Sequence, residues 1–149
     1  MTKIEFLKVL SKGWFGSSIQ HSIHAQLFKA RGLNKLANMI MAESDEEWEE
    51  AKKVNARLIE LGVIPDVVIQ EYPVITDLKE MLEYDCKEAA EALPMMSKAL
   101  SLFDDDYVTR RMIEDFIIGE QDHYNWVKGH LSLIEQIGME NYLIEMLGE

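Results

Sequence analysis

The sequence predicts an all-helical fold, a four-helix bundle with one long crossover and a short fifth helix. Four segments carry apolar residues with the 3.6-residue period of an amphipathic helix, and each ends at a glycine or at an acidic turn. Three prolines and eight glycines are few, which favours long uninterrupted helices. A chain of 149 residues with 48% hydrophobic content can fill one core, so we expect a single domain over residues 1–149.

The first helical segment is predicted from Lys3 to Arg31, with Gly32 as its C-terminal cap. Two glycines, Gly13 and Gly16, weaken its middle by up to about 1 kcal/mol each relative to alanine, which indicates close packing there. The apolar period assigns to its buried side Phe6, Val9, Leu10, Ile19, Ile23, Leu27 and Phe28.

The second segment is predicted from Asn34 to Leu61 and ends at Gly62. Only a short hinge separates it from the first segment, so we expect the two helices to be antiparallel neighbours. Residues 62–75 contain Pro65 and Pro73 and are predicted to form a long connection.

The third segment is predicted from Thr76 to Phe103, with Asp77 capping its start and Pro94 kinking it or freeing a carbonyl. An acidic turn at 104–106 then caps the fourth helix, where the positive end of the helix dipole favours carboxylates.

The fourth segment is predicted from Tyr107 to Ile137, ending at Gly138, and a short helix from about Glu140 to Leu147 follows. Each main segment is long enough for roughly 40 Å of helix. Two short turns and one long crossover between four such helices are typical of bundles with a single long connection.

The charge and composition exclude several classes of function. A formal charge of −12 argues against binding to nucleic acid, which requires cationic groups. No stretch approaches the roughly 20 apolar residues that span a bilayer, and the N-terminus lacks the pattern of a signal peptide. The lone Cys86 cannot form an internal disulfide. We therefore expect a soluble cytoplasmic protein that does not bind membranes.

One motif in the fourth segment is typical of a metal centre. Bundles of this topology hold two metal ions with a Glu from each of two helices and a Glu-x-x-His from each of the others. Glu120 and His123 form one such pair, on one helical face a turn apart. The second segment has no copy, and the nearest equivalent in its acidic centre is Glu47 with Glu50.

The chain resembles the bacterioferritins over nearly its whole length. The resemblance implies a ferritin-like bundle, a di-iron centre that oxidises iron(II), and a cage of 24 subunits whose axes are lined by the fifth helix. The motifs that carry it are His24 to Lys29 before Gly32-Leu33, Ala42-Glu43-Ser44, Glu80-Met81-Leu82 with Asp85, Asp106-Tyr107-Val108, Glu120 to Trp126, and Ile137 to Leu143.

The resemblance implies an incomplete di-iron centre. The two bridging carboxylates fall on Glu47 and Glu120, and the histidine of the fourth helix falls on His123. The histidine of the second helix falls on Glu50, which is still an oxygen donor.

Three further family positions carry residues that cannot bind a metal. The two terminal glutamates fall on Trp14 and Ala89. The methionine that ligates haem between subunits falls on Trp48, so haem is not expected.

Three interpretations of the centre stay open. Glu47, Glu50, Glu120 and His123 could bind one hard cation, or weakly a di-iron pair. The indole of Trp14 could instead plug the cavity. A third hypothesis is a displaced site, because the helical register shifts three side chains in one direction from the vacated positions. That displaced site would use His21, Glu43, Glu47, Asp85 and His123.

Other residues of metal-binding or reactive type have plainer interpretations. His24 is expected to be a hydrogen-bonded core residue and Cys86 a buried, inert thiol. The methionines are expected to fill the core, namely Met39, Met41, Met95, Met96 and Met112.

The sequence therefore favours a bacterioferritin-like protein that binds and stores iron at a degenerate centre, and leaves ferroxidase activity undecided. We expect a homo-oligomer, built from dimers and extending to a 24-subunit cage. Two alternatives stay open. One is a non-catalytic cage subunit, mixed with an active paralogous chain. The other is a small dimeric di-metal oxidase.

Overall fold

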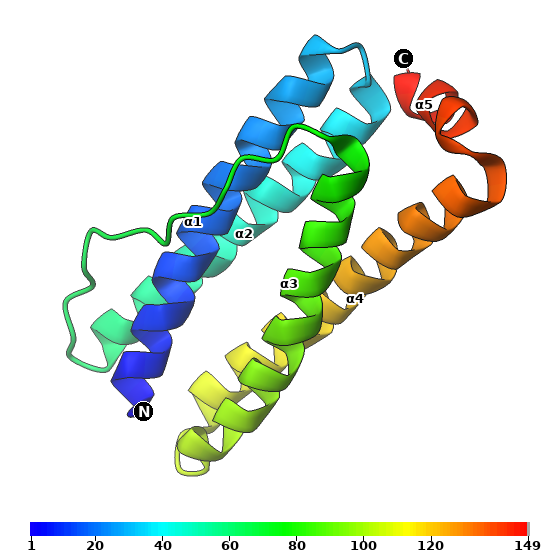
Figure 1. The fold of residues 1–149 in the computed structure, drawn as a ribbon. Helices are drawn as coiled ribbons and strands as arrows, with labels where there is room; N and C mark the ends of the chain where they lie inside the picture. The colour runs from blue at the N-terminus through cyan, green and yellow to red at the C-terminus, as the bar shows by residue number, and fades with distance from the viewer. Residues whose placement is uncertain (149) are drawn as a thin grey trace. The chain divides into compact units, whose positions relative to one another are not determined.

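The computed structural model describes residues 1–148, and within them it contains helices and no strand, which confirms the all-helical prediction (Figure 1). In chain order the elements are α1 (Lys3–Ala30), α2 (Asn34–Glu60), α3 (Leu78–Ala99), the 3-10 helix η1 (Leu100–Phe103), α4 (Tyr107–Ile137) and α5 (Met139–Leu147). None of these helices is both long and apolar enough to cross a membrane.

The helix ends lie close to their predicted positions because the capping residues act as expected. The Thr2 side chain and Glu5 form a capping box at the start of α1. Asp77 accepts the backbone N–H of Glu80 at 3.0 Å, and Asp106 accepts that of Thr109 at 3.1 Å. The glycines that follow α1, α2 and α4 all have a positive φ, which only glycine adopts without strain: Gly32, Gly62 and Gly138.

The third predicted helix differs from the observed one at both ends. α3 begins at Leu78, two residues after Thr76, because Asp77 is its N-cap and lies outside the helix. The last four residues predicted as α-helix, Leu100–Phe103, form a 3-10 turn that leads into the acidic turn. α3 continues through Pro94 to Ala99.

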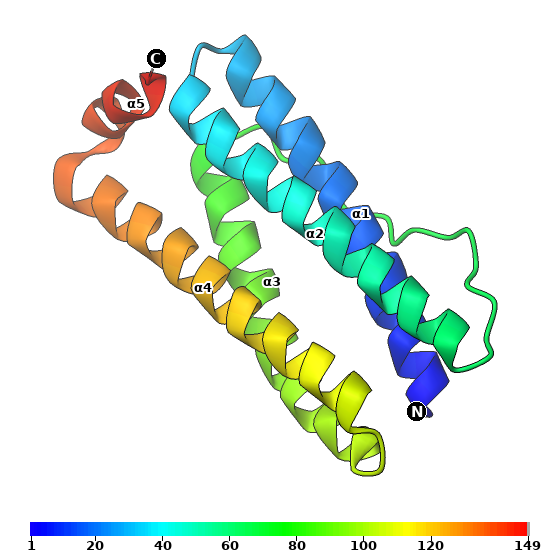
Figure 2. The same ribbon diagram turned by 180° about the vertical axis from the view of Figure 1, so that it is seen from behind.

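The chain divides into two compact units. One contains residues 1–74 and the end of α5 from Leu143, and the other contains residues 75–142. In the first unit α1 and α2 form an antiparallel hairpin, and in the second α3 and α4 do (Figures 1 and 2).

Buried and half-buried hydrogen bonds join α1 to α2 in the first unit. Ser11 donates its hydroxyl to Asn55 Oδ1 at 2.6 Å. Two turns further along α1, Ser18 Oγ donates to the carbonyl of Ser44 at 2.7 Å, and Ser44 Oγ donates back to the carbonyl of Ser18 at 2.6 Å. These bonds fix which residues of the two helices face each other.

The predicted buried side of α1 is only partly correct. Phe6, Leu10 and Phe28 are buried, Val9 is half-buried, and the three other apolar residues are exposed: Ile19 at 38%, Ile23 at 36% and Leu27 at 37%. The buried positions in this half of α1 are taken by polar side chains, namely Ser18, Gln20, His21 and His24. Apolar periodicity misassigned this face because it places polar residues outside by default.

The long connection crosses α1 at close range (Figure 1). The backbone N–H of Gln70 donates to the carbonyl of Lys12 at 2.9 Å, and the Gln20 amide donates to the carbonyl of Pro73 at 2.7 Å. A Cβ atom at Gly16 would lie 2.0 Å from the carbonyl oxygen of Gln70. Close packing over Gly16 is therefore confirmed, since only glycine lets the two backbones approach so closely.

Apolar side chains fill the interior of the second unit. Those fully or almost fully buried are Leu78, Met81, Leu82, Met96, Phe103, Ile113, Phe116 and Val127. Two predictions fail here: Met95 is 41% exposed beside the buried Met96, and Cys86 is half-buried. Both lie on faces of α3 whose orientation periodicity alone did not resolve.

Candidate metal centre

The first unit holds a cluster of the half-buried Ser17 with the buried His21 and Glu47. Ser17 and His21 are one turn apart on α1 and therefore share a face, which α2 covers with Glu47. Glu47 Oε1 is hydrogen-bonded to His21 Nδ1, and the Ser17 hydroxyl donates to Glu47 Oε2. Both His21 and Glu47 are almost completely buried, with 5% and 3% of their surfaces exposed.

This cluster determines which nitrogen of His21 can bind a metal. When His21 donates in this bond, its proton is on Nδ1 and Glu47 accepts it. The lone pair of His21 is then on Nε2. Carboxylates that bind the distal N–H of an imidazole in this way orient metal-ligating histidines in many proteins.

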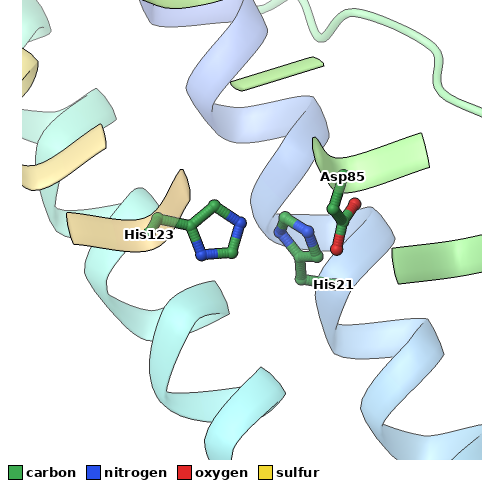
Figure 3. A group of neighbouring side chains, drawn as sticks. All are labelled: His21, Asp85 and His123. Carbon is green, nitrogen blue, oxygen red and sulfur yellow. The ribbon is translucent and has the colours of Figure 1, made fainter. Parts of the chain in front are cut away.

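The second unit brings together Asp85 and His123. Asp85 is buried on α3, His123 is half-buried on α4, and a carboxylate oxygen of the one lies within 4.8 Å of a ring nitrogen of the other. Two ligands each about 2.1 Å from one ion are at most about 4.2 Å apart. A small side-chain adjustment would therefore let Asp85 and His123 share an ion. Figure 3 shows these side chains on α3 and α4, together with His21 on α1.

The other predicted site residues are distributed over both units. Glu50 is half-buried on α2, one turn after the buried Glu47. Glu120 is 9% exposed on α4, one turn before His123, as the Glu-x-x-His spacing predicts. Glu43, included in the displaced-site hypothesis, is half-buried on α2.

The positions that lost a ligand are filled by side chains without a ligating atom. Trp14 is half-buried on α1, and Ala89 is buried on α3 with 1% of its surface exposed. His24 is fully buried, as predicted for a core residue. Sequence reasoning missed Ser17, although its position one turn before His21 was a usable signal.

Comparison with known proteins finds matches over most of the chain. The model of the ferritin-like domain matches residues 4–137. The bacterial ferritin of Neisseria meningitidis serogroup B is 30% identical over 142 residues, which cover 93% of this chain and 92% of the relative.

Two further relatives agree with this match. The bacterial ferritin of Pseudomonas aeruginosa is 29% identical, with 94% of this chain and 93% of the relative covered. The bacterioferritin of Brucella melitensis is 27% identical, with 85% and 81% covered. The chain therefore belongs to the ferritin-like domain family.

Proposed function

We propose that this chain is a bacterioferritin-like protein that binds and stores iron at a degenerate centre, in which Asp85 and His123 of the second unit hold a single ion. The observation that carries the proposal is the pair of Asp85 and His123, whose donor atoms lie within 4.8 Å of each other on facing helices of the second unit. Ferritin-like bundles gather metal ligands from facing helices in this way.

The two donors suit iron(II). Imidazole and carboxylate ligands with open remaining positions are found at many non-haem iron(II) sites. Water would fill the open positions.

The contacts of Glu47 differ from the bridging role that the family pattern implies. Its two carboxylate oxygens are engaged by His21 and by the Ser17 hydroxyl. A carboxylate held in this way is suited to orienting His21 and less suited to bridging two irons. The family-position set of Glu47, Glu50, Glu120 and His123 is therefore the second candidate.

The chemistry of a one-ion centre differs from that of a di-iron centre. A single iron(II) supplies one electron when it is oxidised, whereas reduction of dioxygen to peroxide takes two. Oxidation of iron by this chain is therefore expected to be slower than at a paired centre. Iron would enter as substrate, be oxidised and leave the site as iron(III) for storage.

An anaerobic iron(II) titration followed by oxygen tests the assignment. The wild-type chain is expected to bind one iron per subunit. His123→Ala and Asp85→Asn are expected to weaken binding by more than about ten-fold, because each removes one of the two proposed ligands.

Two matched variants separate the candidate ligand sets. Glu50→Gln and Glu120→Gln change carboxylates of the family position that are not among the proposed ligands, so they are expected to bind iron like the wild type. Loss of iron binding in these two variants, with unchanged binding by Asp85→Asn, would show that iron binds at the family position instead. A wild-type chain that neither binds iron nor oxidises it above the buffer rate would be a structural subunit, and the proposal would be wrong.

We further propose that the chain assembles through the exposed apolar row of α1, formed by Ile19, Ile23 and Leu27. These residues are spaced four apart and form one stripe, and Trp48 on α2 is 44% exposed. On α5, Ile144 is 63% and Leu147 47% exposed, which supports a further contact in a cage.

Analytical ultracentrifugation measures the assembly. A 24-subunit shell is expected for a storage protein, and Ile23→Glu is expected to shift it to monomers. A wild-type dimer with metal-dependent oxygen uptake would indicate the small di-metal oxidase. A chain that enters shells only together with a second ferritin chain would indicate the mixed-cage subunit.

A further inference from the structure

A row of aromatic rings leads away from His123 along the second unit. Residues 123, 126 and 130 are spaced by three and four, so they share one face of α4. The ring of Trp126 is stacked on that of His123, with 6.1 Å between centroids and 12° between planes. The ring centroids of Trp126 and His130 are 4.1 Å apart, and His130 meets Tyr142 edge to face at 5.7 Å.

A hydrogen bond closes the row. The Tyr142 hydroxyl lies 2.8 Å from His130 Nδ1, and the donor depends on the tautomer of His130. In the neutral tautomer protonated at Nε2, Tyr142 donates and Nδ1 accepts. Tyr142 is completely buried, and this burial raises the pKa of its phenol, which keeps the proton on the oxygen at rest.

These groups have the properties of an oxidisable pair. A phenol that loses an electron becomes a strong acid, so its oxidation is easiest where a base already holds a hydrogen bond to it. His130 is such a base, half-buried beside the buried tyrosine. Trp126 is itself oxidisable and lies in ring contact with His130 on one side and with His123 on the other.

We propose that Tyr142 and His130 form a redox pair that donates one electron, through Trp126, to an oxidant at the metal bound by His123. In this step the Tyr142 O–H bond breaks, the proton moves to His130 Nδ1, and the electron passes along the aromatic row. The products are a neutral tyrosyl radical and an imidazolium. The presence of an oxidant beside His123 rests on the proposed iron centre. The aromatic row from His123 to Tyr142 does not.

Hydrogen peroxide is the class of oxidant that this pair would complement. One iron(II), one Tyr142 phenol and one neutral His130 react with one hydrogen peroxide and two protons from solution. They give iron(III), the tyrosyl radical, the imidazolium and two waters. Peroxide gains two electrons, one from iron and one from Tyr142, so no one-electron product of peroxide is released.

The first experiment uses the metal-free protein and a photogenerated one-electron oxidant in solution, with the radical detected by electron paramagnetic resonance. The wild type is expected to give a tyrosyl signal that is lost in Tyr142→Phe and retained in Tyr107→Phe, the matched control at a 78% exposed tyrosine. His130→Leu, which removes the proton acceptor, and Trp126→Phe, which keeps a ring but not its ease of oxidation, are both expected to lose it too. Circular dichroism verifies that each variant is folded.

A radical signal that is equal in the wild type and in the folded Tyr142→Phe variant would overturn the proposal, because a purely structural hydrogen bond predicts that result. Loss of the radical signal in Tyr107→Phe, with the signal retained in Tyr142→Phe, would also overturn the proposal.

The second experiment adds hydrogen peroxide to the chain loaded with iron(II). One tyrosyl radical is expected for each iron oxidised, and none in Tyr142→Phe. If the first experiment succeeds but the chain binds no iron, the iron centre is wrong and the redox pair stands. If iron binds and is oxidised without a radical at Tyr142, the link between the pair and the metal is wrong.

Discussion

The two helical hairpins differ in the kind of side chain that is buried within each of them. Between α1 and α2, hydrogen bonds recur along the interface, from the half-buried Ser11–Asn55 pair through the buried, reciprocal Ser18–Ser44 pair to the buried His21–Glu47 pair. In α3, η1 and α4 most of the buried side chains are apolar, such as Met81, Phe103 and Phe116.

This difference bears on how each hairpin serves the candidate site. A hydrogen bond between helices requires one pairing of residues, so the polar interface of α1 and α2 fixes the register that places His21 against Glu47. Apolar contacts tolerate small shifts better, since volume and not direction decides them. The orientation of His21 is therefore fixed within the first hairpin, whereas Asp85 and His123 lie on the facing helices of the second.

The largest effect on stability is expected where the long connection packs against α1 in the first hairpin. Gly16→Ala places a Cβ 2.0 Å from the Gln70 carbonyl oxygen, so the crossover must move. We expect a loss of about 1–3 kcal/mol in the free energy of unfolding by urea, and faster proteolysis between residues 62 and 77.

The matched control lies in the second hairpin. A Cβ at Gly129 on α4 meets nothing within 4 Å. Gly129→Ala is therefore expected to stabilise the chain by up to about 1 kcal/mol through helix propensity. A Gly16→Ala variant that gains stability like Gly129→Ala would contradict the close approach of the crossover to α1.

A smaller effect is expected from the polar interface itself. Ser18→Ala and Ser44→Ala each remove one buried hydroxyl and leave a carbonyl of the facing helix without that bond. We expect each to lower the free energy of unfolding by about 1 kcal/mol. Ser97→Ala on α3 is the control, since this exposed hydroxyl bonds within its own helix, to the carbonyl of Leu93 at 2.9 Å. Equal losses of unfolding free energy in all three variants would mean that the bonds between α1 and α2 contribute no more stability than a bond within one exposed helix face.

The smallest effect concerns Glu88 on α3. Burial, and then the charge of Glu91, raise the pKa of the Glu88 carboxyl above its ordinary value of 4.5. A carboxyl that binds its proton more tightly in the folded state contributes stability at low pH, and that contribution is lost as pH rises through the raised pKa.

Glu88→Gln cannot ionise, so its melting temperature is expected to exceed that of the wild type at pH 7 and to match it at pH 4. The gain is expected to stay within about 0.5 kcal/mol, because the group is only partly buried. Melting curves at the two pH values test this, and a difference that does not change with pH would contradict the raised pKa.

Local signals in the sequence were enough for the helices and for the kinds of residue in the candidate site. Capping residues such as Asp77 and Asp106, and the glycines that follow the helices, act between near neighbours in the chain and can be recognised there. The Glu-x-x-His spacing likewise placed His123 one turn after Glu120. Helical register also put His21 and Asp85 among the candidates. It predicts that they are shifted in the same direction from Trp14 and Ala89, the two family positions without a ligand.

What only the tertiary structure decided is which side of each helix is buried and which polar groups pair. The buried side of α1 is lined by Ser18 and His21, while Ile19 and Ile23 are exposed, because α2 offers polar partners directly opposite the first two. No pattern within α1 carries that information, since it depends on the residues of a second helix. The sequence by itself determined where the helices run and which residue types can bind iron. The facing helix determined that Glu47 holds His21, because a hydrogen bond exists only where both partners meet.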